Sequence, residues 1–456
     1  MPRLAWFGPM PPARSGVAVN GAEVVAALRG RFEIDVFADE PIAAAHRHER
    51  PPSVRSAHDF VWMHRRQPYD LAIYQLGNSS AHDFLWPYLF RYPGLAVLHD
   101  AHLHHARAAA LLRLRRAADY RAEFVAAHPD VSPDAAELAV AGFDSYLYYA
   151  WPMTRLVAEA SRVTAVHASA MAPALAEETP EAIIDTIRLG HGEPIDEARA
   201  AAARAAVIRR HDLPPAATLF AVFGGLTPEK RVPQVLAAFA ALLPYAPSAR
   251  LLLVGAAAAH YDVLADVRAR EVSSHVTITG HVDDETFTEY VAACDVSLNL
   301  RWPTAREMSG PWLRAIAAGR PTITMDLVQT AGVPSLDPRT WTVAHAATTP
   351  AAAPEPVTVA IDVLDEEHSL RLAMRRLAAD PALRDRLGRA AAAYWRREHS
   401  HEAMLADYDR VIARALATPD PPARLPAHLR ATGEERLHAL LAPFGVEPGA
   451  DLWSRI

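Results

Sequence analysis

A complete strand–helix–strand unit stands in the stretch VSLNLRWPTAREMSGPWLRAIAAGRPTITMD (residues 296–326). Its two ends are short apolar runs, continuous rather than alternating, as in strands that are buried on both faces. Between them, SGPWLRAIAAG (309–319) has the length of a short helix, with Pro311 in the first turn, where a missing N–H does no harm. This order of elements predicts an α/β fold built on a parallel sheet.

The same alternation extends over most of the chain. Apolar β-rich runs are separated by helical patterns such as GVAVNGAEVVAALRG (16–30), whose apolar residues recur every three or four positions. We therefore expect two Rossmann-like, doubly wound halves that face a central cleft, since such sheets bind ligands beyond the carboxyl ends of their strands. The expected strands are 4–8, 34–38, 71–77, 95–100 and 162–169 in the first half, and 219–225, 250–255, 276–280, 296–301 and 321–326 in the second.

Domain limits follow from length and from the connecting segments. The chain has 456 residues, about three times the ~150 of a typical domain. A polar segment with glycine and proline separates the halves near 190–200, and the sequence after residue 365 is helical. The expected parts are an acceptor-binding domain over 1–195, a donor-binding domain over 196–385, helices over 386–416 that pack back toward the first domain, and a Pro-rich linker with a short helical tail over 417–456.

Composition excludes several classes of protein. The net charge is −7 and no run is rich in lysine or arginine, so the basic stripe that nucleic acid requires is missing. The single cysteine, Cys294, rules out a disulfide framework and fits a reducing cytosol. No run reaches the ~18 apolar residues of a membrane helix, and the opening MPRLAWFGPMPPARSG resembles a first strand rather than a signal peptide. We expect a soluble cytoplasmic protein, with contact at the inner membrane face left open; the Ala- and Arg-rich composition indicates a GC-rich bacterial genome.

A helix start in the second half is a candidate anion site. The helix that begins at Ser309 or Gly310 carries unpaired N–H groups and a partial positive charge, directly behind Glu307. Glycine at this point allows an anion to approach the backbone closely. An ordinary capped helix explains the same residues equally well.

A second segment favours the phosphate interpretation. FGGLTPEKR (223–231) leaves a strand, turns through Gly224 and Gly225, and brings Lys230 and Arg231 to the start of a helix. Cations and free amides at one edge of a sheet suit a diphosphate. A pair of solvated basic side chains is the alternative.

Polar residues also follow strands of the first half. LAVLHD (95–100) ends in His99 and Asp100, and three more histidines follow closely, but a helix would spread them over several faces, so we expect no metal site. His99 could instead hydrogen-bond a sugar or an acceptor. His167 is a second candidate, for which a core histidine satisfied by backbone is the alternative. The turn GPMPPARSGVAV (8–19) lacks GxGxxG spacing, so a dinucleotide fingerprint is not supported.

Together, the motifs FGGLTPEKR, TITGHVDDETF, ACDVSLNLRWPTAREMSG and LRAIAAGRPTI resemble the donor-binding half of retaining glycosyltransferases of the GT-B fold, family GT4 (glycosyl transferases group 1). The first half is similar through GPMPPARSGVAV, LHDAHLHH and VHAS, so the resemblance runs from about residue 3 to 415. It implies transfer of a sugar, with retention, from a nucleoside-diphosphate sugar to an acceptor hydroxyl. The nucleotide is UDP or GDP ahead of ADP, and no metal or other cofactor is implied. The acceptor stays open among saccharides, lipid-linked glycans and small molecules.

The resemblance also implies roles for single residues. Lys230 would neutralise the diphosphate with Arg231 beside it, while the amides of Ser309 and Gly310 bind phosphate and Glu307 faces the sugar. The other implied contacts are Gly224 and Gly225 in the turn, Ser15 and Gly16 at the diphosphate from the acceptor side, His99, Asp100 and His167 toward sugar or acceptor, and Val282 near the base.

One departure from the family pattern keeps alternatives open. The family commonly has two glutamates eight residues apart, the second often on the ribose, and here Arg306 and Arg314 stand in that register, with Glu307 one residue later. A family variant with a Glu-x-Ser-Gly loop looks similar, and Arg314 could meet phosphate instead. The alternatives are a nucleotide-sugar epimerase or hydrolase of the same architecture and a non-catalytic nucleotide-sugar-binding homologue; an NAD-dependent oxidoreductase lacks its glycine fingerprint.

Overall fold

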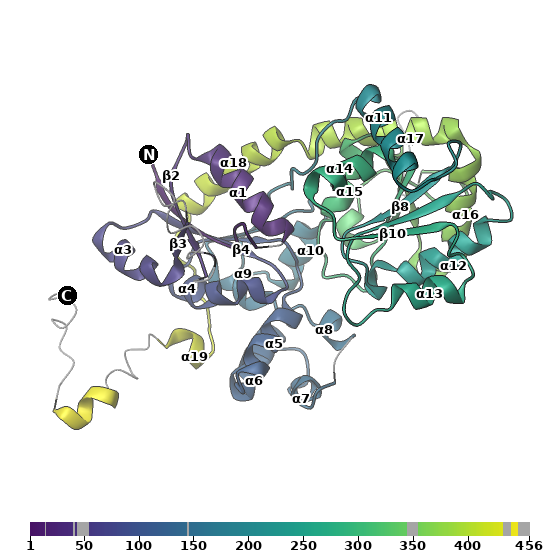
Figure 1. Ribbon diagram of the computed structural model, residues 1–456. Helices are drawn as coiled ribbons and strands as arrows, with labels where there is room; N and C mark the ends of the chain where they lie inside the picture. The colour runs from purple at the N-terminus through teal and green to yellow at the C-terminus, as the bar shows by residue number, and fades with distance from the viewer. Residues whose placement is uncertain are drawn as a thin grey trace. The chain divides into compact units, whose positions relative to one another are not determined.

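The structure is a computed structural model that describes residues 1–13, 15–39, 42, 54–143, 146–343, 354–431 and 439–445 (Figure 1). Its contacts divide the chain into two compact units. The first unit comprises Met1–Val166, Ala174–Asp185 and Arg410–Ile456, and the second comprises His167–Pro173 and Thr186–Asp409. Residues 186–195 and 386–409 thus belong to the second unit, whereas the chain from Arg410 onward returns to the first.

The first unit contains a seven-stranded sheet in the order β3-β2-β1-β4-β5-β6-β7, and its paired strands run parallel. All five expected strands are confirmed, and two short edge strands, β3 and β7, were not expected. Three residues each are too few to stand out in an apolar pattern. The strands are β1 (Arg3–Phe7), β2 (Glu33–Ala38), β3 (Val54–Ser56), β4 (Leu71–Leu76), β5 (Leu95–Leu98), β6 (Val163–Val166) and β7 (Ile184–Thr186).

The second unit contains a seven-stranded sheet in the order β10-β9-β8-β11-β12-β14-β13, again parallel, which differs from the first sheet only in the exchange of its last two strands. Its five expected strands are also confirmed, and β13 and β14 extend the sheet at one side. The doubly wound α/β fold predicted from the sequence is therefore present in both units. The strands are β8 (Leu219–Phe223), β9 (Arg250–Val254), β10 (Val276–Gly280), β11 (Val296–Asn299), β12 (Thr322–Met325), β13 (Ser335–Leu336) and β14 (Thr358–Ile361).

Helices cover these sheets. In the first unit they are α1 (Gly16–Leu28), α3 (Phe60–Arg66), α4 (Trp86–Arg91), α5 (His104–Arg113), α6 (Ala117–Ala127), α7 (Ala135–Val140), α8 (Leu147–Ala150), α9 (Arg155–Ala160) and α19 (Ala427–Arg430). In the second unit they are α11 (Glu197–Arg210), α12 (Val232–Leu242), α13 (Val263–Ala269), α14 (Asp284–Ala293), α15 (Gly310–Ala317), α16 (Glu366–Ala379) and α17 (Pro381–Glu398). Two more cross the division, α10 (Met171–Glu178) and α18 (His401–Ala417).

Strand β8 shows why the second sheet is covered on both faces. Phe220 and Val222 pack in one core cluster with α12 and α13, and Ala221 and Phe223 pack in another with α11 and α14. Figure 1 shows α12 and α13 on one side of these strands and α14 on the other. Because successive side chains of a strand point to opposite faces, a continuous apolar run is needed to fill both layers.

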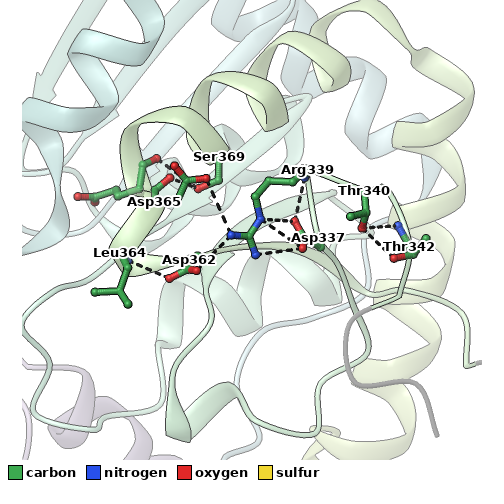
Figure 2. Close-up of polar contacts among 9 residues, drawn as sticks. Asp337, Arg339, Thr340, Thr342, Asp362, Leu364, Asp365 and Ser369 are labelled. Carbon is green, nitrogen blue, oxygen red and sulfur yellow. Dashed lines mark hydrogen bonds and ion pairs between the residues drawn. The ribbon is translucent and has the colours of Figure 1, made fainter. Parts of the chain in front are cut away.

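An arginine joins the ends of two strands at the edge of this sheet. Figure 2 shows Arg339 between Asp337, which follows β13, and Asp362, which follows β14. Its Nε lies 3.1 Å from Asp337 Oδ1, and its Nη1 lies 3.3 Å from Asp362 Oδ2. Asp365 lies 4.0 Å from the same guanidinium group. Exposed ion pairs of this kind contribute little to stability. We therefore interpret the cluster as a surface contact between the segments that follow β13 and β14.

The C-terminal part of the chain is described in pieces. The expected tail helix EERLHALLAPFG spans 434–445, and residues 434–438 of it lie outside the described residues. In the described part of the chain, no helix combines the length and the apolar character that a membrane span requires.

Candidate functional site

A pocket of about 170 Å³ lies at the carboxyl edge of the second sheet. Its walls are formed by segments that follow β8, β11 and β12, together with the first turn of α15. Strands β8 and β11 are neighbours, and from them the strand order runs outward in opposite directions. Open α/β sheets bind their ligands at such a switch point. The polar side chains of the lining are Lys230, Asn299, Arg301, Glu307, Ser309, Thr324, Gln329 and Thr330.

Lys230 is the basic group at the base of this pocket, and it is the only lysine of a chain with 46 lysine and arginine residues. It ends a 3-10 turn capped by Thr227, and its Nζ donates to Phe223 O at 2.6 Å. Burial, with a smaller contribution from the nearby Arg301, lowers the pKa of Lys230 to about 7, although Glu307 opposes the shift. A bound anion would therefore favour the protonated amine.

Gly224 makes room for this lysine. Its φ is +86°, a conformation that side chains disfavour, and a Cβ at this position would lie 2.5 Å from Lys230 Nζ. Gly225 differs, because a Cβ added there would meet no atom within 4 Å. The structure thus requires the first glycine of the pair and not the second.

Glu307 projects from the loop between β11 and α15 and is fixed through both carboxylate oxygens. Oε1 pairs with Arg301 Nε at 2.5 Å, and Oε2 accepts a hydrogen bond from Thr304 Oγ1 at 2.8 Å. Arg306, the residue before it, adopts a left-handed φ of 57°, and its N–H donates to Thr304 Oγ1. Such backbone strain is typical of functional loops.

The start of α15 completes the pocket. Ser309 is the N-cap, and its Oγ accepts from Trp312 N at 3.3 Å. Pro311 has no N–H and Leu313 N–H donates to Ser309 O, so in the described structure the amide of Gly310 is the first-turn donor left for an anion. Gly310 also lies against His191, whose Cδ2 would be 3.3 Å from an added Cβ.

Arg231 and Arg314 do not line the pocket. Arg231 forms a two-pronged ion pair with Glu366 of α16. Arg314 points to α14, where it pairs with Asp284 and lies 4.3 Å from the ring centre of Phe287. Both guanidinium groups therefore join helices of the second unit, and the sequence could not reveal this because their partners are remote along the chain.

The predicted residues of the first unit follow the carboxyl ends of β1 and β5. Ser15 caps α1 by accepting from Ala18 N at 3.1 Å, and Gly16 begins the helix. His99 Nε2 donates to Gln75 Oε1 at 2.8 Å, and Asp100 Oδ2 accepts from Asn78 N at 2.7 Å. The side chains of Ser15, His99 and Asp100 are thus each hydrogen-bonded within the first unit.

Two further predicted residues are embedded in the protein. His167 is buried, its Nδ1 donates to Ile187 O at 2.7 Å, and burial lowers its pKa to about 4. This agrees with the interpretation of His167 as a backbone-satisfied core histidine. Val282 follows the edge strand β10 and packs against the core cluster that contains Phe223.

Metal ligands were considered separately. Among the described residues, no three His, Cys, Asp or Glu side chains are grouped so that they could hold a metal ion. The histidines near His99 take other partners: His104, for example, is buried between Trp151 O and Tyr120 OH.

Sequence reasoning missed two polar residues that line the pocket, Arg301 and Gln329, and Thr304, which is hydrogen-bonded to Glu307 and Gln329. Arg301 and Thr304 stand in the loop after β11, so their position at a strand end was a signal that could have found them. Gln329 follows β12, and no pattern along the chain links it to Glu307.

Comparison with known proteins agrees with this geometry. Residues 217–352, which include all the loops of the pocket, match the family model described as glycosyl transferases group 1. The expected resemblance to that family is confirmed for this part of the chain. A search of curated proteins gave no match.

Solved structures share the fold over nearly the whole chain. Sucrose-phosphate synthase from Thermosynechococcus elongatus superposes with a TM-score of 0.62 at 16% identity, covering 91% of this chain and 100% of the other. HepE of Anabaena, in complex with UDP and glucose, gives 0.59 at 13%, covering 91% and 100%. The catalytic domain of starch synthase IV from Arabidopsis thaliana, bound to ADP and acarbose, gives 0.59 at 12%, covering 91% and 99%. The protein therefore has the GT-B glycosyltransferase fold.

Proposed function

We propose that this protein is a retaining glycosyltransferase of family GT4 that moves a sugar from a nucleoside-diphosphate sugar to an acceptor hydroxyl. The observation that carries the proposal is the pocket at the β8–β11 switch point, where Lys230, Arg301 and the start of α15 surround Glu307. Positive groups beside one carboxylate suit a substrate in which a diphosphate is joined to a sugar. The family match over the same loops supports this assignment.

In the proposed reaction, the bond between the anomeric carbon and the diphosphate oxygen breaks, and the acceptor oxygen bonds to that carbon from the same face. Lys230, Arg301 and the Gly310 N–H stabilise the negative charge that develops on the leaving diphosphate. The released phosphate oxygen takes the proton of the acceptor hydroxyl. Atoms and charge therefore balance without a separate base or a metal ion.

Glu307 acts electrostatically in this scheme. Its two oxygens are held by Arg301 and Thr304, so the carboxylate is oriented, and the ion pair with Arg301 lowers its nucleophilicity. Its negative charge instead stabilises the positive charge that develops at the anomeric centre.

The remaining assignments are part of the same proposal. Ser15 and Gly16 would contact the diphosphate, His99 and Asp100 the sugar or acceptor, and Val282 the base. UDP and GDP rank ahead of ADP, and UDP is the first to test because HepE has been solved with UDP and with UDP-glucose. We place the reaction in the bacterial cytoplasm, with an acceptor that is either soluble or carried at the inner membrane face.

The first experiment measures the melting temperature with UDP, GDP, ADP and NAD at millimolar concentration. A ligand at a hundred times its dissociation constant adds about 2.7 kcal/mol to the free energy of unfolding. A rise with one nucleoside diphosphate and none with NAD supports the donor site. A rise with NAD alone, or with no nucleotide, contradicts the proposal.

A second experiment tests the reaction itself. The protein is incubated with a panel of glycans and with the nucleoside-diphosphate glucose whose nucleotide stabilised it. The anomeric configuration of the product is determined by NMR. Retention in the wild type and loss of turnover in Glu307→Gln, with nucleotide affinity preserved, are expected. An inverted product contradicts the mechanism, and free sugar released equally well without an acceptor favours the hydrolase.

A further inference from the structure

Gln329 has a buried side-chain amide, and the proposed reaction gives this amide no role. It lies in the 3-10 turn Val328–Thr330 that follows β12, and 8% of its surface is exposed. Its side chain lines the pocket that also contains Glu307 and Lys230. A buried polar side chain in such a place needs a hydrogen-bonding role.

The hydrogen bonds around Thr304 fix which way the amide points. The Thr304 hydroxyl has one proton, which it donates to Glu307 Oε2 at 2.8 Å. It can therefore only accept from its other neighbours, and it does so from Arg306 N at 2.9 Å and from Gln329 Nε2 at 3.1 Å. A flipped Gln329 would set two acceptors against each other, so Nε2 faces Thr304 and Oε1 faces away from it.

The amide oxygen of this pocket-lining residue has no hydrogen-bond partner in the described structure. Oε1 is buried, and within the described part of the chain no donor reaches it. A buried acceptor without a partner costs roughly 1–3 kcal/mol, which a ligand hydroxyl would recover on binding.

We propose that Gln329 determines which sugar the pocket accepts, by taking a hydrogen bond from one hydroxyl of the transferred sugar at Oε1. The inference rests on the proposed function, since it names a contact of the donor sugar in the same site. Through Thr304, the amide is joined to the carboxylate of Glu307, so a correct sugar hydroxyl also helps to hold Glu307 in place. A sugar without that hydroxyl leaves the acceptor unpaired, and such sites reject analogues strongly.

The test compares the wild type with Gln329→Met, which keeps the length of the side chain and removes both polar atoms. The probes are UDP, UDP-glucose and the four analogues of UDP-glucose that lack the 2-, 3-, 4- or 6-hydroxyl of the sugar. If GDP alone stabilises the protein, the corresponding GDP compounds are used. Dissociation constants are measured by calorimetry. Gln234→Met is the matched control, because Gln234 also has a buried, unpartnered Oε1 among the described residues but does not line the pocket.

The expected result is a loss of about tenfold or more for one deoxy form with the wild type and with Gln234→Met. In Gln329→Met that loss disappears, and the dissociation constant of UDP changes less than about twofold. The inference is overturned if the wild type and Gln329→Met rank the deoxy forms alike, or if Gln329→Met weakens UDP and UDP-glucose equally. Absence of any nucleotide binding in the wild type would instead overturn the proposed function.

Gln329→Asn keeps the test informative if the methionine variant does not fold. The shorter amide retains its polarity but withdraws Oε1 from the pocket, so it should reproduce the loss of discrimination. Melting curves without ligand show whether each variant is folded before binding is compared.

Discussion

The two sheets share the order of their first five strands, and their carboxyl edges carry different side chains. In the second unit, the loops after β8 and β11 bring Lys230, Arg301 and Glu307 around a pocket. In the first unit, the side chains at the ends of β4 and β5 are hydrogen-bonded to one another and to the backbone: Gln75 O accepts from His82, and Gln75 Oε1 accepts from His99. Burial lowers the pKa of His82 to about 4, which keeps that ring uncharged.

The difference between the two edges shows that the fold provides the crevice, whereas the side chains decide what can bind in it. A doubly wound sheet opens a crevice at its switch point whatever its sequence. The second edge places Lys230, Arg301 and the start of α15 around one pocket, and the family match falls on that half. We therefore expect nucleotide affinity to depend on the second edge, and substitutions at the two edges can test this directly.

The largest effect is expected at Lys230. In Lys230→Ala the diphosphate loses a charged hydrogen-bond donor worth about 1.5–3 kcal/mol, so UDP affinity should fall about 10- to 150-fold by calorimetry. Lys230→Arg should fail as well, because the space beside Gly224 admits a compact amine and a guanidinium group is wider.

A substitution at the carboxyl edge of the first sheet serves as the control for Lys230→Ala. His99→Ala should leave the affinity for UDP, which has no sugar, within about twofold of the wild type, since we propose that His99 serves the sugar or the acceptor. An equal loss in His99→Ala and Lys230→Ala would remove the distinction between the edges.

The affinity for UDP should change nearly tenfold per pH unit above pH 7. Free Lys230 has a pKa of about 7, so above pH 7 the amine must take up a proton when a diphosphate binds. Affinity for UDP should therefore fall as the pH rises from 7.5 to 9.5. Lys230→Ala should show no such slope.

The pKa itself can be measured because the chain has one lysine. Reductive methylation with carbon-13 formaldehyde labels Lys230 and the N-terminal amine, and NMR follows both signals with pH. A lysine signal that titrates near the ordinary value of 10.5 in the free protein would refute the explanation. A shift toward higher pH when UDP is added would support it.

A smaller effect is expected at the glycine pair. Gly224→Ala places a side chain at a φ of +86° and against Lys230 Nζ, which should cost about 1–3 kcal/mol of folding free energy and displace the amine from the pocket. Gly225→Ala should change neither the melting temperature nor UDP affinity appreciably. Equal losses in the two variants would show that the lysine does not depend on Gly224.

The elements were predictable because their signals are local. Continuous apolar runs identified ten strands, apolar periodicity identified the helix that begins at Gly16, and the start of α15 was expected at Ser309 or Gly310. The same local order placed Lys230 and Glu307 after β8 and β11, and therefore at one edge of a parallel sheet. Edge strands such as β3, with three residues, were too short to read.

The amino-acid sequence by itself determined the two sheets, the carboxyl ends of their main strands and the single lysine that lies at one of these ends. Tertiary structure alone decided which charges face the pocket: Arg231 pairs with Glu366, 135 residues away, and Arg314 turns to α14. It also joined Gln329 to Thr304 and Glu307. The physical reason is that backbone patterns depend on neighbours along the chain, whereas the partner of a charged or amide side chain depends on which elements the folded sheet brings together.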